Sequence, residues 1–126
     1  MLQLRDLRVV IDGHEIIRID ELDLAPGSRL GLVGESGSGK TMTAKAIAGL
    51  LPDESKVSGS VIFDGQDLLT LNDREMSKVR GKRIGFVFQD PARSLNPMMR
   101  IGKQVSEAIR IHSDLKGDSV TAKVID

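Results

Sequence analysis

Residues 34–41 have the sequence Gly-Glu-Ser-Gly-Ser-Gly-Lys-Thr, which fully satisfies the pattern of a phosphate-binding loop. A short apolar run at residues 29–33 precedes the loop, and a stretch rich in alanine, isoleucine and leucine follows it. The pattern requires a strand before the loop and a helix after it. The motif therefore predicts an α/β chain in which a buried strand at residues 29–33 leads through the loop into a helix.

Each residue type in this loop suits the binding of a nucleoside triphosphate with Mg²⁺. Glycine lets the backbone N–H groups turn inward around a polyanion. The lysine would place its ammonium among the β- and γ-phosphates, and the threonine hydroxyl would be a ligand of Mg²⁺. The helix that starts here directs the positive end of its dipole at the phosphates. The predicted phosphate-binding residues are Gly34, Glu35, Ser36, Gly37, Ser38, Gly39, Lys40 and Thr41.

The loop alone does not separate kinases, GTPases, helicases and transport ATPases, but composition excludes other classes of site. Eighteen basic and eighteen acidic residues cancel, and the aromatic content is 2%, so we expect no nucleic-acid partner. The absence of cysteine excludes disulfides and cysteine-ligated metal within these residues. We find no signal peptide or apolar run long enough to span a bilayer, so we expect a cytoplasmic chain without direct membrane insertion.

Strands are predicted where apolar residues lie between turn signals. These segments are residues 2–11, 16–24, 57–63 and 83–88, with turns at Asp12-Gly13, Pro26-Gly27 and Asp64-Gly65. The first alternates imperfectly, and the last places Ile84, Phe86 and Phe88 on one face.

Helices are predicted where apolar residues recur at helical spacing. The helix after the loop has an apolar face and is expected to stop at Pro52. Asn72, with Glu75 three residues on, predicts a capping box at the start of a short helix that ends near Gly81. After a turn at Asn96-Pro97, an amphipathic helix is predicted from Ile101, and the tail at residues 114–126 suggests a further helix around Ser119. The apolar positions of the two longer helices are Ala44, Ala46, Ile47, Ala48, Leu50 and Leu51, then Ile101, Val105, Ala108 and Ile109.

The arrangement LVGESGSGKT followed by FVFQDPARSLNPMM resembles the ABC ATPase superfamily, within it the subfamily that serves oligopeptide, dipeptide and nickel importers. The stretches AIAGLLP, VSGSVIFDGQDLL and RGKRIGFVFQDP carry the resemblance too, which extends from Leu4 to about Ile111. It implies a truncated P-loop NTPase fold of the ABC ATPase type: an N-terminal β-subdomain, the P-loop core and the start of the helical subdomain. The resulting division of the partial ABC ATPase domain, residues 1–126, is 1–33 for N-terminal strands, 34–51 for the loop and helix, 57–91 for strands and the Q-loop, and 92–126 for the helical subdomain.

The resemblance also assigns roles to single residues. Gln89 matches the Q-loop glutamine, which in the family reaches toward Mg²⁺ and the attacking water. Residues 90–101, from Asp90 to Ile101, match the segment that faces the membrane subunits of the transporter. Ile11 occupies the place of the aromatic residue that stacks on adenine, with His14 as an alternative contact. Met42 stands where many members have a hydroxyl residue, so only its backbone N–H would reach the α-phosphate.

These expectations make the chain the ATP-binding, energy-coupling subunit of an importer for peptides or related solutes. It would bind Mg-ATP, pair with a second identical or paralogous ATPase subunit, and lie on the cytoplasmic face of the membrane. The 126 residues contain neither an LSGGQ-like signature nor a Walker B strand ending in Asp-Glu, so we expect binding without turnover. We also expect a piece of a longer gene product, because residues 29–33 would otherwise have an open apolar edge. The alternatives are a non-catalytic nucleotide-binding remnant and half of a DNA-repair or chromosome-maintenance ATPase.

Overall fold

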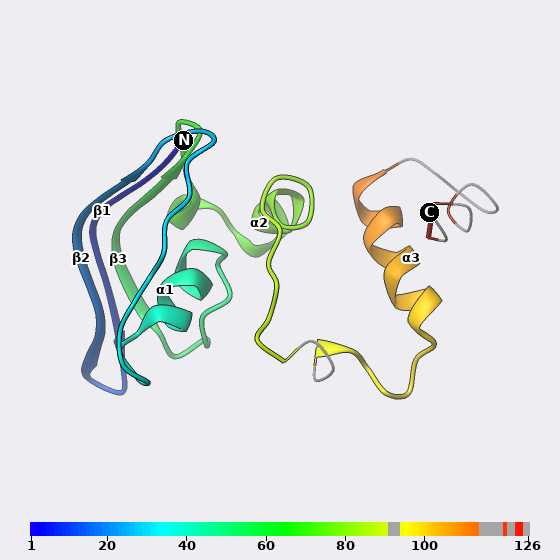
Figure 1. The fold of residues 1–126 in the computed structure, drawn as a ribbon, viewed down its shortest axis with the longest axis horizontal. Coiled ribbons are helices and arrows are strands. Elements are labelled where there is room, and N and C mark those ends of the chain that lie inside the picture. The colour runs from blue at the N-terminus through cyan, green and yellow to red at the C-terminus, as the bar shows by residue number, and fades with distance from the viewer. Residues whose placement is uncertain (91–93, 114–119, 121–122, 125–126) are drawn as a thin grey trace. The chain divides into compact units, whose positions relative to one another are not determined.

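The computed structural model describes residues 1–90, 94–113, 120 and 123–124. The chain forms two compact units, Met1–Met76 and Ser77–Asp126 (Figure 1). The first unit holds an antiparallel sheet with helical segments, one of which runs across the boundary at Met76, and the second holds the amphipathic helix. No helix in the described part of the chain is long and apolar enough to cross a membrane.

Four strands form the sheet of the first unit, in the spatial order β2-β1-β3-β4. Every neighbouring pair is antiparallel. Their bounds are β1 Leu2–Ile11, β2 His14–Leu24, β3 Lys56–Phe63 and β4 Gln66–Asp67. The strands predicted at residues 2–11, 16–24 and 57–63 are therefore confirmed. Asp12-Gly13 and Asp64-Gly65 have positive φ angles and form the two-residue hairpin loops that Asp-Gly pairs favour.

A bulge explains the imperfect alternation along β1. Asp6 has a φ of 47°, and the pairing of β1 with β3 shifts register between Arg5 and Arg8. Leu4 and Leu7 are both fully buried although they are three residues apart. The extra residue therefore resets the side-chain period of two. Gly59, with a φ of 91°, lies opposite the bulge, where a side chain would meet the backbone oxygen of Arg5 at 2.5 Å.

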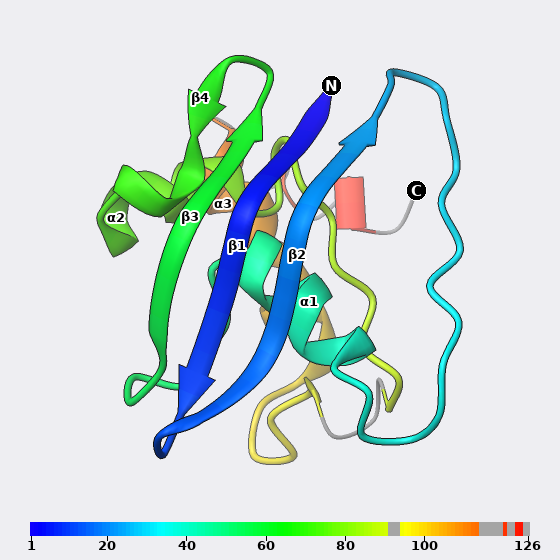
Figure 2. The ribbon, with the colours of Figure 1, turned by 90° about the vertical axis from the view of Figure 1, so that its left-hand side faces the viewer.

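The core of the first unit lies between one face of the sheet and α1 (Lys40–Ile47), which crosses that face in Figure 2. It is made of aliphatic side chains of the three long strands and of two alanines, one at the end of α1 and one that caps it. Buried members of this core are Leu4, Leu7, Val9, Ile17, Val61, Ala46 and Ala48.

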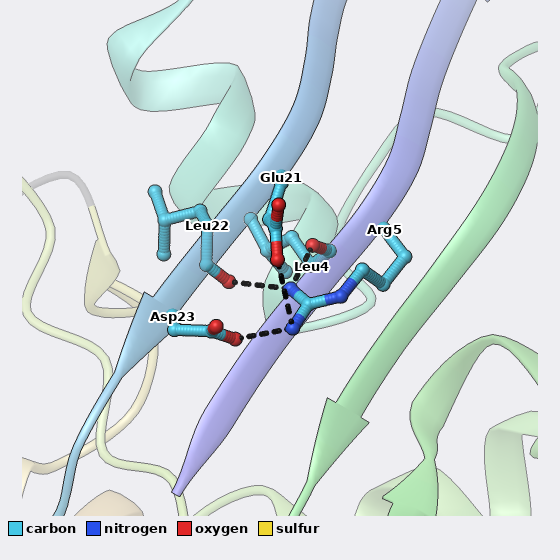
Figure 3. Close-up of polar contacts among 5 residues, drawn as sticks. All are labelled: Leu4, Arg5, Glu21, Leu22 and Asp23. Carbon is cyan, nitrogen blue, oxygen red and sulfur yellow. Dashed lines mark hydrogen bonds and ion pairs between the residues drawn. The ribbon is translucent and has the colours of Figure 1, made fainter.

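The opposite face of the sheet carries charge. The Arg5 guanidinium donates to the carboxylate of Asp23 at 2.7 Å and to the backbone oxygens of Leu4 and Leu22, and it lies 3.4 Å from Glu21 (Figure 3). The hydrogen bond from Arg5 lowers the pKa of the Asp23 carboxyl below its usual value of 3.8. Ion pairs therefore join β1 to β2 on this exposed face.

The helix after the loop ends earlier than the sequence predicts. The prediction of a stop at Pro52 was wrong, because α1 ends at Ile47 and Gly49 follows with a φ of 63°. The N–H of Gly49 donates to the oxygen of Ala46, and the N–H of Leu50 donates to that of Lys45. This pair of bonds is a Schellman motif, which satisfies the last carbonyls of the helix.

The remaining helical segments are η1 (Leu68–Thr70), α2 (Asp73–Val79) and α3 (Ile101–His112). The capping box is confirmed: Asn72 Oδ1 accepts from Glu75 N at 2.9 Å, and Glu75 Oε2 accepts from Asn72 N at 3.0 Å. Val120 and residues 123–124 are helical, whereas the predicted start at Ser119 lies outside the described residues.

The predicted strand at residues 29–33 was wrong. These residues form no ladder, and Leu30, Leu32 and Val33 are 52%, 46% and 98% exposed. Figure 2 shows the stretch as part of a long segment that runs from the end of β2 to the start of α1. The predicted strand at residues 83–88 is likewise reduced to one bridge, between Arg80 and Ile84. An apolar run becomes a strand only where another strand supplies hydrogen-bond partners.

Candidate functional site

The predicted phosphate loop lies between the end of that segment and α1. A turn closes it, with Ser38 N donating to the oxygen of Glu35 at 3.2 Å. Gly37 and Gly39 have φ angles of 82° and 86°, which lie in the left-handed region. Such a conformation turns successive N–H groups toward one side of the loop, as an anion cradle requires.

A second irregularity of the sheet lies beside the loop. Val9 pairs with Ile17 and Val10 with Glu15, so Ile16 is an extra residue at a bulge of β2. The loop comes so close here that a side chain on Gly39 would lie 2.9 Å from the backbone oxygen of Ile16. Only glycine fits both this approach and the positive φ angle at Gly39.

The first turn of α1 is open to an anion. It has no side-chain cap and no acidic residue, so no side chain of this turn neutralises the positive end of the helix dipole. The buried Thr43 fixes the helix start, because both its N–H and its hydroxyl donate to the oxygen of Gly39, at 2.8 and 2.9 Å. Thr41 lies in this first turn and is exposed.

The ammonium of Lys40 folds back over the loop. It donates to the backbone oxygens of Gly34 and Glu35, at 2.7 and 2.5 Å, and to the hydroxyl of Ser38 at 3.1 Å. These three acceptors match the three donors of an ammonium group. The positive charge is therefore held directly beside the N–H groups of the loop.

Ile11, the predicted adenine contact, lies at the end of β1 in the same unit. It is half-buried and pairs with the exposed His14, whose Nδ1 lies 3.0 Å from the oxygen of Asp12. His14 precedes the bulge at Ile16 by two residues. The contact between Gly39 and Ile16 thus brings the loop to the Ile11 end of the hairpin.

Gln89 lies in the second unit and is exposed. It follows residues 85–88, in which the rings of Phe86 and Phe88 lie in contact with centroids 4.7 Å apart and planes tilted by 48°, consistent with their predicted common face. Of the predicted partner-facing segment, residues 91–93 lie outside the described residues. Met98 and Ile101, which the structure does describe, are 92% and 64% exposed.

Sequence reasoning missed one residue that contacts this segment. The side-chain amide of Gln104 makes three hydrogen bonds to the backbone of residues 96 and 99. The only sequence signal is a polar residue between the apolar positions Ile101 and Val105 of an amphipathic helix. That signal does not distinguish a backbone clamp from a solvated side chain.

Comparison with known proteins places the chain in a family. The family model described as ABC transporter matches residues 17–125. The oligopeptide transport ATP-binding protein OppD of Escherichia coli (strain K12) is 42% identical over 120 residues, which cover 91% of this chain and 35% of that protein. OppD of Haemophilus influenzae is 51% identical over 89 residues, covering 71% of the chain and 28% of the relative. The probable peptide ABC transporter ATP-binding protein y4tR of Sinorhizobium fredii is 39% identical and aligns with the whole chain.

A solved structure supports the fold. The dimeric, post-hydrolysis ATP-binding cassette MJ0796, bound to ADP and Pi, aligns with a TM-score of 0.82 at 24% identity, covering 99% of this chain and 54% of that one. The predicted fold, a partial P-loop NTPase of the ABC ATPase type, is therefore confirmed. The chain spans about a third of the length of the OppD protein of Escherichia coli. With a family model that matches most of its residues, the chain belongs to the ABC transporter family.

Proposed function

We propose that the chain is the Mg-ATP-binding part of the ATP-binding subunit of an ABC importer for peptides. The observation that carries this proposal is the uncapped start of α1, where left-handed Gly37 and Gly39 precede the folded-back Lys40. Backbone N–H groups, a helix dipole and an ammonium together suit a polyphosphate. The same arrangement contains no carboxylate in the first turn that would repel it.

Different residues would bind the phosphates, the Mg²⁺ ion and the adenine of the nucleotide. The N–H groups of residues 34–42 would hold the phosphates, and Lys40 would exchange some of its three backbone and hydroxyl acceptors for phosphate oxygens. Thr41 and Gln89 would be ligands of Mg²⁺. Ile11 would offer aliphatic surface to adenine. When bound, Mg-ATP supplies the free energy that couples the subunit to transport.

The peptide substrate and the partners rest on the relatives. The OppD proteins are named as oligopeptide transport ATP-binding proteins, which supports peptide import here. The described part of residues 90–101 would face the membrane subunits, and a second ATP-binding subunit would complete the pair. The subunit would then lie on the cytoplasmic face of the membrane without entering it.

We propose further that these 126 residues bind Mg-ATP without turning it over. Their sequence includes no signature motif and no apolar strand that ends in Asp-Glu. The base and the second metal anchor that phosphoryl transfer needs would have to come from elsewhere. Non-catalytic binding is thus the activity we expect of the chain taken alone.

Calorimetric titration of the chain with Mg-ATP tests this proposal. Lys40→Ala should weaken binding by about 10- to 100-fold, the value of a charge-assisted hydrogen bond, while the circular dichroism spectrum stays unchanged. Lys45→Ala, in the same helix, is the matched control and should bind as the wild type does. Equal binding by wild type and Lys40→Ala would refute the role of the loop. If inorganic phosphate bound as tightly as Mg-ATP, the loop would be a general anion site and not a nucleotide site. ATP hydrolysis above the rate of Lys40→Ala would refute binding without turnover.

A further inference from the structure

Gln104 is the side chain that joins α3 to the turn before it. Its Oε1 accepts from Asn96 N at 2.9 Å, and its Nε2 donates to Asn96 O at 3.0 Å and to Met99 O at 2.8 Å. The acceptor and both donors of the amide are thereby used on the backbone. Arg100, the N-cap of α3, makes no side-chain cap hydrogen bond. Gln104 thus provides the side-chain link between helix and turn.

The turn itself is compact. Met99 N donates to Asn96 O at 3.1 Å, and Met98 N donates to Asn96 Oδ1 at 2.9 Å. Pro97 occupies the position of a β-turn at which its fixed φ angle is favoured. Asn96 therefore has its N–H, its oxygen and its side chain committed, and Gln104 supplies two of these contacts.

The clamped turn presents apolar side chains to solvent. Leu95 and Val105 are each 42% exposed, Ile101 is 64% exposed and Met98 is 92% exposed. The sequence contains no Asp or Glu between Asp90 and Glu107, so this stretch places no negative charge among the exposed apolar side chains. Exposed apolar side chains on an ordered turn are typical of contact surfaces.

We infer that Gln104 is a positioning residue that holds the turn at residues 96–99 in the conformation in which Met98 and Ile101 meet the membrane subunits. This inference rests on the proposed function, which supplies the partner. A turn already fixed by three side-chain hydrogen bonds loses less conformational freedom when a partner binds. Without the amide of Gln104, the turn and α3 would still form, but the turn would exchange among conformations.

Amide hydrogen exchange of the chain tests the clamp itself. Gln104→Ala should speed exchange of the Asn96 amide roughly tenfold, the factor for losing one net hydrogen bond, while the amides of β1 stay protected. Gln104→Glu keeps the acceptor for Asn96 and loses both donors, so we expect a smaller change in the same direction. Glu107→Ala, exposed and three residues further along α3, should change nothing. An unchanged Asn96 amide in Gln104→Ala would overturn the inference, whatever the chain binds.

Docking of the complete ATP-binding subunit onto its own importer's membrane subunits, held in lipid nanodiscs, tests the positioning role. Gln104→Ala should weaken docking at least about fivefold and leave Mg-ATP affinity unchanged, whereas Glu107→Ala should leave both unchanged. Faster Asn96 exchange with undiminished docking would overturn the positioning role. If the wild type did not bind Mg-ATP, only the proposed function would be contradicted. The exchange rate of the Asn96 amide would still show whether Gln104 holds the turn.

Discussion

The antiparallel sheet and the two segments at residues 29–33 and 85–88 contain similar apolar residues but differ in strand pairing and in the exposure of these residues. β1 lies between β2 and β3, and its Val9 is fully buried. Val33 and Val87 have the same side chain, belong to no strand or helix, and are 98% and 92% exposed. Both segments lie next to residues of the candidate site, the loop in one case and Gln89 in the other.

This difference lies in where the hydrogen-bond partners come from. The strand pairs β1–β2 and β3–β4 are each closed by a two-residue Asp-Gly turn, and β3 pairs with the other edge of β1, so every strand of the sheet has a partner. A nearly continuous apolar run such as residues 29–33 is typical of parallel strands, which need neighbours brought by distant chain. Among the described residues no such neighbour pairs with it. An apolar run thus predicts side chains that favour burial, but they are buried in a sheet only where the backbone pairs with other strands.

The largest effect is expected where the sheet approaches itself most closely. Gly59→Ala should destabilise the chain by about 3 kcal/mol, because the new Cβ would strike the backbone of β1 at a φ of 91°. Gly31→Ala, in an unpaired segment with nothing within 4 Å, should change the free energy of unfolding by less than about 0.5 kcal/mol. Urea denaturation measures both. Equal decreases in the free energy of unfolding would show that the paired and unpaired segments do not differ in packing.

Three valines give the most direct comparison of side chains. Val9→Ala should cost about 2 kcal/mol, from the lost transfer free energy and the cavity it leaves. Val33→Ala and Val87→Ala should each cost less than about 0.5 kcal/mol, because water already reaches both side chains. Thermal unfolding of the three variants measures this. A cost at Val33 that matches Val9 would show that residues 29–33 are packed in solution.

The capping box tests a purely local element. Asn72→Ala should cost about 1 kcal/mol, because the N–H of Glu75 loses its acceptor at the start of α2. Glu75→Ala removes the reciprocal bond to Asn72 N and serves as the paired variant, with a smaller expected cost. Chemical denaturation provides the values. Two neutral variants would mean that packing alone holds α2.

The smallest effect concerns the charged face of the sheet. Arg5 lowers the pKa of Asp23, so this contact stabilises the fold while Asp23 is ionised and is lost as pH falls through that lowered pKa, below 3.8. Asp23→Asn should therefore flatten the acid limb of the stability curve slightly relative to the wild type. Because the pair is exposed, the difference should shrink further in high salt. Identical acid limbs would show that the contact contributes nothing.

The sequence predicted those parts of the fold that local chemistry determines. The Asp-Gly turns and the Asn72–Glu75 pair each lie within a few residues, and the structure confirms them. The stop of α1 failed because Gly49 satisfies the helix carbonyls before Pro52 is reached. Asp6, at the bulge, could not be predicted, because its positive φ angle depends on Gly59 of a strand about fifty residues away.

The same division applies to the candidate site. The residues of the phosphate loop follow from their own spacing, because backbone and lysine chemistry at a helix start is local. The approach of Gly39 to Ile16 and the three contacts of Gln104 depend on how separate elements meet. The type of a single residue does not predict which distant element it will contact.

Hydrogen exchange of the chain with and without Mg-ATP tests most directly whether residues 34–42 bind nucleotide. We predict that Mg-ATP slows exchange of the amides of Gly37, Gly39 and Lys40, and that Lys40→Ala abolishes the slowing. Amides of α2, which contains no residue of the candidate site, provide the internal reference and should not change. Absence of slowing in the loop, or equal slowing in Lys40→Ala, would contradict a nucleotide site built on this loop.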